Sequence, residues 1–369
     1  MSLQQTREFV KRYSNVLFFV AGFIFDVFTL IRIDSTLDLV YQSVYLGLIT
    51  FILIRQVRYE RGDWHPTGFV AKLWHHETEA IHFFYGGLLS AYVIFYFKST
   101  TASRSLIFLL LTAILLFANE MPQVKKAGSK MRVGLHAFCM VSYLNYLIPV
   151  LVGRMGWWTF ALAVLLTGLS SYWLVQHLEK LYHRTASPLG PKDPSIPKLA
   201  LGWPPAMVLI AVVTLYAFKW IPPVPLSMQY GGVYHQIEKE NDKYRLIYPK
   251  PPWYLFWQKD SHRFLARPCD SISCFVRIFA PRRFTHQVYM RWSFKNPVSG
   301  KYQYADRMAL SINGGRGEGY RGYGTKSNYE PGQWRVEIET EDGRMIGAVP
   351  FTVITDPNTE PRVWRDRRM

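Results

Sequence analysis

Cysteine is scarce in this chain, with three residues among 369. Cys139 falls inside an apolar segment, where it is expected to act as a small apolar residue. Cys269 and Cys274 stand in the polar C-terminal part with four residues between them. Because neither further cysteines nor a matching histidine pair accompany them, a zinc site is not indicated. In an oxidising compartment the two thiols could close a small disulfide loop, and the sequence leaves the bonded and the free state open.

Acidic residues are also few, since 26 Asp and Glu stand against 43 Lys and Arg and give a formal net charge of +17. An excess of this kind is typical of proteins that bind nucleic acid. Here most of the basic residues fall in short loops between apolar segments, which is a pattern of membrane topology. The chain is therefore expected to bind no nucleic acid.

Charge is nearly absent from long runs in the first part of the chain. The clearest run is Trp203–Ser227, in which PPAMVLIAVVTLYAF ends at Lys219-Trp220 and a proline-rich IPPVPLS follows. This pattern predicts a final membrane span, an interfacial aromatic and a stiff exit linker. Several such segments approach the ~20 residues that cross ~30 Å of hydrocarbon. We predict seven spans, at Asn15–Arg32, Leu37–Ile54, Glu79–Phe97, Leu106–Asn119, Val133–Val152, Trp157–Val175 and Trp203–Ile221.

The loops between these segments predict the orientation. The intervening loops on one side hold only Arg32, Lys98, Arg104 and Arg154. The alternate loops hold many more basic residues: Arg7, Lys11, Arg12, Arg55, Arg58, Arg61, Lys72, Lys125, Lys126, Lys130, Arg132, Lys180, Arg184, Lys192 and Lys198. By the positive-inside rule the N-terminus is expected in the cytoplasm. With an odd number of spans, the C-terminal domain is expected in the periplasm of a bacterial inner-membrane protein.

From about Gln229 the pattern changes to a period of two residues. Strand-like runs such as CFVRIF, QVYMRWSF and QWRVEIE alternate with turn signals such as Asn296-Pro297 and Asp342-Gly343. The pattern predicts an antiparallel, immunoglobulin-like β-sandwich after an all-α membrane bundle. We predict four parts: a transmembrane domain (1–227), an aromatic and proline-rich connector (228–260), the β-sandwich (261–356) and a loose charged tail (357–369).

The motifs of the C-terminal part have a characteristic order. A tryptophan strand, QVYMRWSF, precedes a Gly-Tyr-Arg-Gly run, then Pro-Gly-x-Trp-Arg-Val and a closing Gly-x-x-x-Phe-x-Val. Over about 75 residues this order resembles a bacterial family catalogued as domain of unknown function twenty-nine-fourteen. The membrane part is similar to the uncharacterised polytopic region that accompanies that domain in some proteobacterial proteins. The resemblance implies a bacterial envelope protein and supplies no activity.

Ionisable residues within the membrane part form one candidate site. His75, Glu79 and His82 share a helix face at i, i+4 and i+7, and the predicted topology brings Glu120 and His136 to the same depth. Imidazole and carboxylate groups on one face are suited to a metal or a proton. The stronger interpretation is structural, with these residues in the headgroup zone, where charge costs little. Asp26, inside the first span, is expected to be a carboxyl group at a helix interface.

The string GGRGEGYRGYG in the β-domain provides a second candidate site. No helix pattern follows it, so it is not a dinucleotide or Walker motif. We expect a glycine-rich hairpin with positive-φ residues that holds Arg316, Arg321 and Tyr323 outward. Arg and Tyr on a rigid edge are suited to bind carboxylates, phosphates or sugars. Trp292 and Trp334 are expected in the sandwich core.

The first functional hypothesis is a binding, sensing or scaffold component of the cell envelope rather than an enzyme. It needs no cofactor, and its partners are the lipid bilayer and an envelope protein or anionic envelope polymer, with a homo-oligomer as a further option. The alternative is an intramembrane metal-dependent enzyme, with a divalent transition metal, or a proton-coupled transporter that uses the His/Glu cluster. The two hypotheses place the sensitive residues on opposite sides of the membrane.

Overall fold

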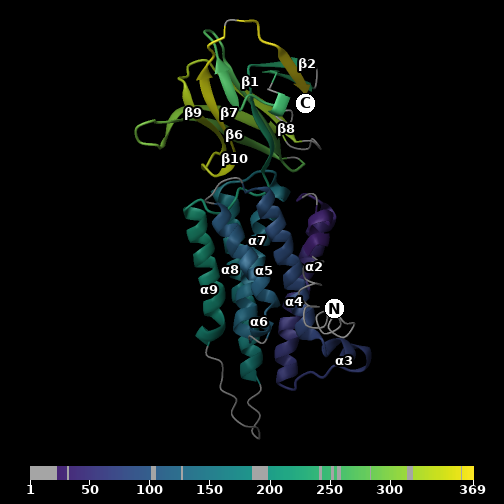
Figure 1. The fold of residues 1–369 in the computed structure, drawn as a ribbon. Coiled ribbons are helices and arrows are strands. Elements are labelled where there is room, and N and C mark those ends of the chain that lie inside the picture. Colours follow the sequence, from purple (N-terminus) through teal and green to yellow (C-terminus); the bar gives the residue numbers. More distant parts are fainter. Residues whose placement is uncertain are drawn as a thin grey trace, which may run out of the picture. The chain divides into compact units, whose positions relative to one another are not determined.

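The computed structural model describes residues 23–30, 33–100, 105–125, 128–184, 198–240, 243–250, 253–255, 259–282, 284–313, 319–358 and 360–369. The chain divides into two compact units. The helical unit comprises Met1–Lys98, Leu106–Leu151 and Trp157–Ile221, and the β unit comprises Ser99–Ser105, Val152–Gly156 and Pro222–Met369. Figure 1 shows the helices and the sheets of the two units.

The helical unit consists of long apolar helices joined by short connections. A described helical stretch at 23–29 precedes them. The helices are α2 (Thr36–Glu60), α3 (Gly68–Trp74), α4 (Glu77–Lys98), α5 (Leu106–Glu120), α6 (Pro122–Lys125), α7 (Ser129–Val152), α8 (Trp157–Arg184) and α9 (Lys198–Ala217). Ser35 caps α2, because its side chain accepts a hydrogen bond from the Asp38 backbone N–H at 3.5 Å.

Four helices of the described residues are long and apolar enough to cross a membrane: Thr36–Glu60, Glu77–Lys98, Ser129–Val152 and Trp157–Leu181. The apolar helices Leu106–Glu120 and Leu201–Ala217 are shorter. A helix of 15 residues, such as α5, spans only about 22 Å at ~1.5 Å per residue. The first predicted segment lies largely outside the described residues. The prediction of seven transmembrane helices is therefore not supported, and up to four candidate spans remain.

A ladder of tyrosines joins α4 to α7. The hydroxyls of Tyr85, Tyr92 and Tyr96 donate to backbone carbonyls of α7 at 2.7, 2.9 and 3.1 Å. One of these carbonyls belongs to Cys139, a buried residue as expected. Asp26 accepts a hydrogen bond from Ser90 Oγ at 2.6 Å, which places it at a helix interface as the sequence predicted. The bundle thus satisfies buried hydroxyls through backbone carbonyls of neighbouring helices.

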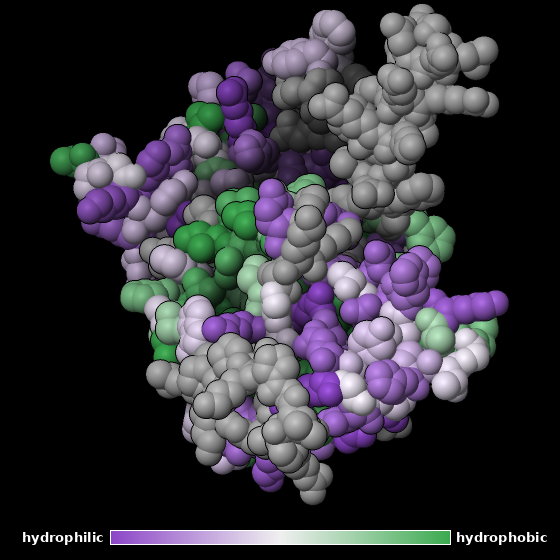
Figure 2. Space-filling view, turned by 90° about the horizontal axis from the view of Figure 1, so that it is seen from below, coloured by the Kyte–Doolittle hydropathy of each residue, from purple (hydrophilic) through white to green (hydrophobic). Residues whose placement is uncertain are grey.

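Large apolar side chains also cover outward faces of the helices. Examples are Phe51 on α2, Leu110 on α5 and Leu165 on α8, all of which are exposed. Figure 2, a view from below, shows hydrophobic residues gathered beside hydrophilic ones on the face that it displays. Exposed apolar area on long helices is typical of contact with lipid.

The β unit contains three sheets. The first has the order β1 (Ser227–Tyr234), β5 (Ile272–Phe279), β8 (Tyr320–Lys326). The second has the order β4 (Arg263–Ala266), β10 (Met345–Thr355), β9 (Gly332–Thr340), β6 (Thr285–Lys295), β7 (Tyr302–Asn313). The third has the order β11 (Trp364–Arg368), β3 (Lys243–Pro249), β2 (Gln236–Glu240). A 3₁₀ turn, η2 (Trp253–Leu255), follows β3.

One apolar core joins the three-stranded sheet β1-β5-β8 to the five-stranded sheet. Val276 and Ile278 of β5 lie in this core with Val336 and Ile338 of β9. The core also contains Trp292 and Trp334, as the sequence predicted. The pairs between neighbouring strands are antiparallel except that β4 runs parallel to β10. The prediction of a C-terminal β-sandwich is confirmed, whereas its immunoglobulin-like topology stays a prediction.

The third sheet lies within segments that we expected to be a connector and a loose tail. Residues 236–240 form β2 and residues 243–249 form β3, and β11 pairs with β3 along Trp364–Arg368. Next to the end of β11, two backbone hydrogen bonds of 2.7 and 2.9 Å join Met369 to Tyr244 of β3. Tyr234, Leu246, Tyr248 and Phe275 form a second small core with the outer face of the first sheet. The sequence did not predict β11 because its residues are mostly charged and lack an apolar alternation. The strand forms through backbone hydrogen bonds to β3.

Candidate functional site

The predicted His/Glu residues of the membrane part have different polar partners in the structure. His82 Nδ1 lies 2.8 Å from Asn119 Oδ1 between α4 and α5, whereas His136 Nε2 lies 2.9 Å from Thr50 Oγ1. His75 and Glu79 are exposed. Glu120, at the end of α5, is half-buried. Among the described residues, no group of three His, Cys, Asp or Glu side chains could hold a metal ion.

A buried carboxylate in α8 is the polar group of this unit that sequence reasoning passed over. Glu179 is 3% exposed, and neither of its oxygens has a hydrogen-bond partner in the described part of the chain. Its burial depends on packing against other helices, which the sequence does not display.

Cys269 and Cys274 are free thiols in the structure. Cys274 lies on the inner side of β5 in the sandwich core, and burial raises the pKa of its thiol. Cys269 is exposed in the turn before β5 and has a φ of 70°. Of the two states that the sequence left open, the structure therefore has the free one, because the strand directs one cysteine inward while the turn leaves the other in solvent.

The glycines of the glycine-rich string have a different structural role from the one we expected. Arg316 lies outside the described residues, and of the described glycines in the string only Gly319 has a positive φ, 87°. Gly322 and Gly324 lie within β8 on its inner side. A Cβ on Gly324 would come within 2.9 Å of the sulfur atoms of two core methionines. These glycines thus allow close packing inside the sandwich, which leaves Arg321 and Tyr323 on the outer face.

A row of polar side chains crosses the outer face of the first sheet. Tyr230 of β1 pairs with Arg277 of β5, and Arg277 pairs with Arg321 of β8. Arg367 of β11 extends this group, since its guanidinium carbon lies 4.9 Å from the centre of the Tyr230 ring. We call these four residues the tyrosine–arginine row. The sequence offered one signal for it, because Arg277 interrupts the otherwise apolar run CFVRIF.

Tyrosines border the row. The hydroxyls of Tyr230 and Tyr234 are hydrogen-bonded to each other, and Tyr323 packs against Tyr244 with ring centres 6.0 Å apart. Burial raises the pKa of Tyr230, so its hydroxyl keeps its proton at neutral pH. Asp260 is the acidic group whose charge acts on both Tyr230 and Tyr234. The border therefore offers hydroxyl groups and one carboxylate beside three guanidinium groups.

Directly opposed like charges destabilise a sheet. Arg277 faces Arg321 across the strands, and no salt bridge joins Arg277 to an acidic residue of the described chain. A phosphate or carboxylate bound between the two guanidinium groups would relieve this repulsion and accept charge-assisted hydrogen bonds. The row is therefore suited to bind an anion.

The outer face of the five-stranded sheet carries arginines of a different kind. Arg291 Nε donates to Glu337 Oε2 at 2.9 Å, and Arg335 Nη2 lies 2.5 Å from Glu337 Oε1. Arg307 Nε lies 3.1 Å from Glu339 Oε1. Both glutamates are buried beneath the guanidinium groups. On this face the arginines neutralise buried carboxylates, so their ion pairs stabilise the sheet.

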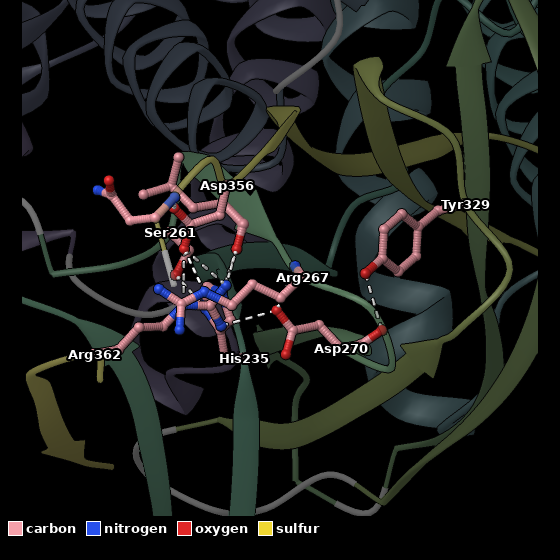
Figure 3. A network of polar contacts seen from close by, with 9 residues as sticks. His235, Ser261, Arg267, Asp270, Tyr329, Asp356 and Arg362 are labelled. Atoms are coloured by element: carbon pink, nitrogen blue, oxygen red, sulfur yellow. Dashed lines mark hydrogen bonds and ion pairs between the residues drawn. The ribbon is translucent and has the colours of Figure 1, made fainter. Parts of the chain in front are cut away.

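A third polar network surrounds His235 at the end of β1 (Figure 3). His235 Nδ1 lies 3.3 Å from Ser261 Oγ and Nε2 lies 3.2 Å from Leu265 O, while the ring stacks on Phe264 with centres 4.0 Å apart. Burial lowers the pKa of His235 to about 4. The ring is therefore neutral at pH 7, so that Nε2–H donates to the carbonyl and Nδ1 accepts from the serine hydroxyl.

Arginines tie this network to the segment before β11. Arg362 donates to Asp270 Oδ2 at 2.8 Å and to Asp356 Oδ2 at 3.3 Å, and Arg267 Nε donates to Asp356 at 2.7 Å. The backbone N–H of Asn358 and these arginines lower the pKa of Asp356. Figure 3 shows the labelled side chains directed toward one another.

A serine beside a neutral histidine resembles the start of a nucleophilic site. Ser261, however, is 3% exposed, and the other nitrogen of His235 is occupied by a backbone carbonyl and not by a carboxylate. A substrate could not reach this hydroxyl in the structure. The network therefore holds the end of β1 and the segment before β11 together.

Residues 285–353 match the family model described as protein of unknown function (DUF2914). This match confirms the family resemblance that the motifs indicated, with the domain at the C-terminal end of the chain. No curated protein matches the chain.

Two solved structures are similar to the chain at low scores. One is an immunoglobulin-like protein from Pseudomonas aeruginosa, with 9% identity, a TM-score of 0.22 and coverage of 36% of this chain and 98% of that chain. The other is the Pseudomonas fluorescens alkylpurine DNA glycosylase AlkC bound to DNA containing an abasic site analog, with 10% identity, a TM-score of 0.20 and coverage of 88% and 99%. Scores this low carry no argument about fold or function.

Proposed function

We propose that this chain is a bacterial inner-membrane protein whose β unit stands in the periplasm and binds an anionic polymer of the cell envelope. The observation that carries the proposal is the placement of Arg277 beside Arg321 on one sheet face, with Arg367 at the end of the row. Three guanidinium groups and the Tyr230 hydroxyl match the oxygen atoms of phosphate or carboxylate groups.

A polymer fits this site better than a single small anion. Tyr323 is 39% exposed beside the row, and such an aromatic can contact a sugar or a backbone that carries the charges. Repeated phosphates or carboxylates would allow several weak contacts to act together. The function would be to bind or sense the polymer, or to hold the protein against it, without chemical change.

The test compares two double variants that remove the same charge. Full-length protein in nanodiscs of uncharged lipid is titrated with fluorescent polyphosphate and, separately, with polyglutamate. Arg277→Gln with Arg321→Gln should raise the dissociation constant at least tenfold for one polymer or both. Arg263→Gln with Arg365→Gln removes two exposed arginines outside the row and should change it less than twofold. Equal losses in both double variants, or no binding of either polymer, would contradict the proposal.

The periplasmic placement is a separate part of the proposal. It is supported by the concentration of Lys and Arg in alternate loops. Reporter fusions after Met369 distinguish the two sides: alkaline phosphatase should be active there and a cytoplasmic fluorescent protein should not. The opposite result would move the row to the cytoplasm.

A proton pathway through the helical unit is the second candidate. The observation that favours it is Glu179, a buried carboxylate with no hydrogen-bond partner among the described residues. His82 and His136 are buried polar groups of the same unit. A proton flux into liposomes that depends on Glu179, and is lost in Glu179→Gln, would favour this function over an anchoring role.

A further inference from the structure

A cavity of about 350 Å³ lies where α2 ends, α3 passes and α4 begins. Tyr59 and His65 line one part of it, and Trp74, His75 and Glu77 line another. All of these residues belong to the helical unit. The cavity is independent of the tyrosine–arginine row and has no part in the proposed function.

Aromatic rings form the walls of the cavity at steep angles to one another. The Tyr59 ring centre lies 6.0 Å from that of Trp74, with 57° between the planes, and 6.5 Å from that of His65, with 76°. The Trp64 ring centre lies 4.7 Å from that of Trp74, with 83° between the ring planes. Arg55 in turn lies over the Trp64 ring at 5.0 Å. Tyr59, His65 and Trp74 thus gather aromatic rings around one partly open cavity, and an organic cation is attracted to the π faces of such rings.

The charge of the cavity also favours a cation. Glu77 is the acidic residue in its lining. Its Oε1 accepts a hydrogen bond from Thr78 Oγ1 at 3.1 Å, and no lysine or arginine of the described chain is paired with it. In a chain with a net charge of +17, an acidic residue among aromatic rings without a basic partner is unusual and offers a counter-ion to an ammonium group.

The helix that forms one side of the cavity has an apolar exposed surface. Phe69, Val70 and Leu73 of α3 are 73%, 48% and 58% exposed, and none of the seven residues of α3 is buried. Figure 1 shows α3 at the end of the bundle where α2 and α4 are connected. A short helix of this kind, between two candidate membrane spans, is expected to lie in the bilayer interface with its apolar side chains among the lipid tails.

We propose that this cavity binds the ammonium group of a phospholipid headgroup, such as that of phosphatidylethanolamine. The rings of Tyr59 and Trp74 contact the charged ammonium group and the methylene groups attached to it. The Glu77 carboxylate forms an ion pair with the ammonium group. His65 and His75 supply further hydrogen-bond partners. The interfacial position of α3 brings the headgroup to the cavity while the acyl chains remain in the bilayer.

Basic residues next to the cavity complete the match to a zwitterionic lipid. Arg58 precedes Tyr59 in the last turn of α2, and Lys72 lies on α3 two residues before Trp74. Either side chain can reach a phosphate attached to the bound ammonium group by a two-carbon link. The lipid would thus tie α3 to the ends of two spans.

The test uses delipidated full-length protein in detergent and native mass spectrometry. Phosphatidylethanolamine and phosphatidylglycerol with identical acyl chains are titrated separately, and soluble glycerophosphoethanolamine forms a third arm. We expect phosphatidylethanolamine to bind at least tenfold more tightly than phosphatidylglycerol. Glu77→Gln should remove that preference, whereas Glu79→Gln, an exposed carboxylate two residues away that is not part of the lining, should retain it.

A second pair of variants tests the same cavity in case Glu77→Gln does not fold. Trp74→Leu should weaken phosphatidylethanolamine at least fivefold, and Trp157→Leu, an exposed tryptophan at the start of α8, should leave it unchanged. Equal affinity for the two lipids, or equal effects of Glu77→Gln and Glu79→Gln, would overturn the assignment. Binding of the soluble headgroup as tightly as the lipid would overturn the lipid as ligand and point to a free amine.

Discussion

Both outer faces of the β-sandwich carry arginines, but the arginines have different neighbours on the two faces. On the five-stranded sheet, Arg291, Arg307 and Arg335 cover the buried carboxylates of Glu337 and Glu339. On the three-stranded sheet, Arg277 lies beside Arg321 and a tyrosine. The first arrangement is complete within the chain. The second sets two arginines opposite each other on neighbouring strands and is suited to an anionic ligand, which is why we assign function to that face.

The comparison also shows that the number of arginines says little by itself. A guanidinium group over a buried glutamate is required by the fold, since removal of either partner leaves a desolvated charge. A guanidinium group beside another one is tolerated by the fold and is not needed for it. The two faces should therefore respond in opposite ways to loss of charge, in stability and in ligand binding.

The largest effect is expected on the paired face. Glu337→Gln leaves Arg291 and Arg335 without their shared carboxylate and should lower the free energy of unfolding by about 3–4 kcal/mol. Chemical denaturation of the full-length protein in detergent measures this change. A loss below about 1 kcal/mol would show that the face is not stabilised by its ion pairs, and the contrast between the faces would disappear.

The His235 network joins the strand of Tyr230 to the segment before β11, and its effect depends on pH. The pKa of His235 is about 4 in the folded protein and ~6.5 in the unfolded chain, so the unfolded state binds more protons between these values. This contribution is present above pH ~6.5 and is lost as the pH falls toward 4, a change of roughly 3 kcal/mol. His235→Gln should flatten the dependence of stability on pH in this window. An unchanged slope would assign the acid sensitivity to other groups, such as Asp356.

A smaller effect is expected at the entry to β8. Gly319 has a φ of 87°, and a Cβ there would lie 2.8 Å from the Ile278 carbonyl oxygen. Gly319→Ala should therefore lower the free energy of unfolding by about 1–2 kcal/mol and weaken anion binding, because the strand that carries Arg321 is displaced. Gly300→Ala is a matched control, since Gly300 also has a positive φ, 65°, but nothing within 4 Å of a Cβ. Similar losses in anion affinity for the two variants would show that β8 does not position the site.

The smallest effect on stability is expected in the row itself. Arg277→Gln should change the free energy of unfolding by less than about 0.5 kcal/mol, because the substitution removes a repulsion with Arg321 and no ion pair. The same denaturation experiment tests it beside Glu337→Gln. A loss comparable to that of Glu337→Gln would mean that Arg277 is a structural residue.

Much of this arrangement could be predicted from the sequence, and the omissions have physical causes. Alternating apolar residues revealed β5, β6, β9 and β10, and the tryptophans were correctly placed in the core. The strands β2, β3 and β11 were missed because charged side chains and prolines hide their pairing, which depends on backbone hydrogen bonds. Without β11 the sequence could not connect Arg367 to Tyr230.

The candidate site was found only in part for the same reason. Arg321 and Tyr323 were identified from the glycine-rich string, but Arg277 and Tyr230 come from strands 44 and 91 positions earlier than Arg321, and their register is a property of the sheet. In the helical unit, a period of three to four residues aligned His75, Glu79 and His82 on one helix. It could not show that His82 pairs with Asn119 while His136 pairs with Thr50.

The thermal midpoint of the full-length protein as a function of inorganic phosphate, at constant ionic strength, tests the central claim most directly. We predict that the midpoint rises with phosphate for the natural protein and for Arg263→Gln with Arg365→Gln, because the anion binds between Arg277 and Arg321 in the folded state. Arg277→Gln with Arg321→Gln should abolish the rise. An equal rise in all three proteins, or none in the natural protein, would contradict the assignment of this face as an anion site.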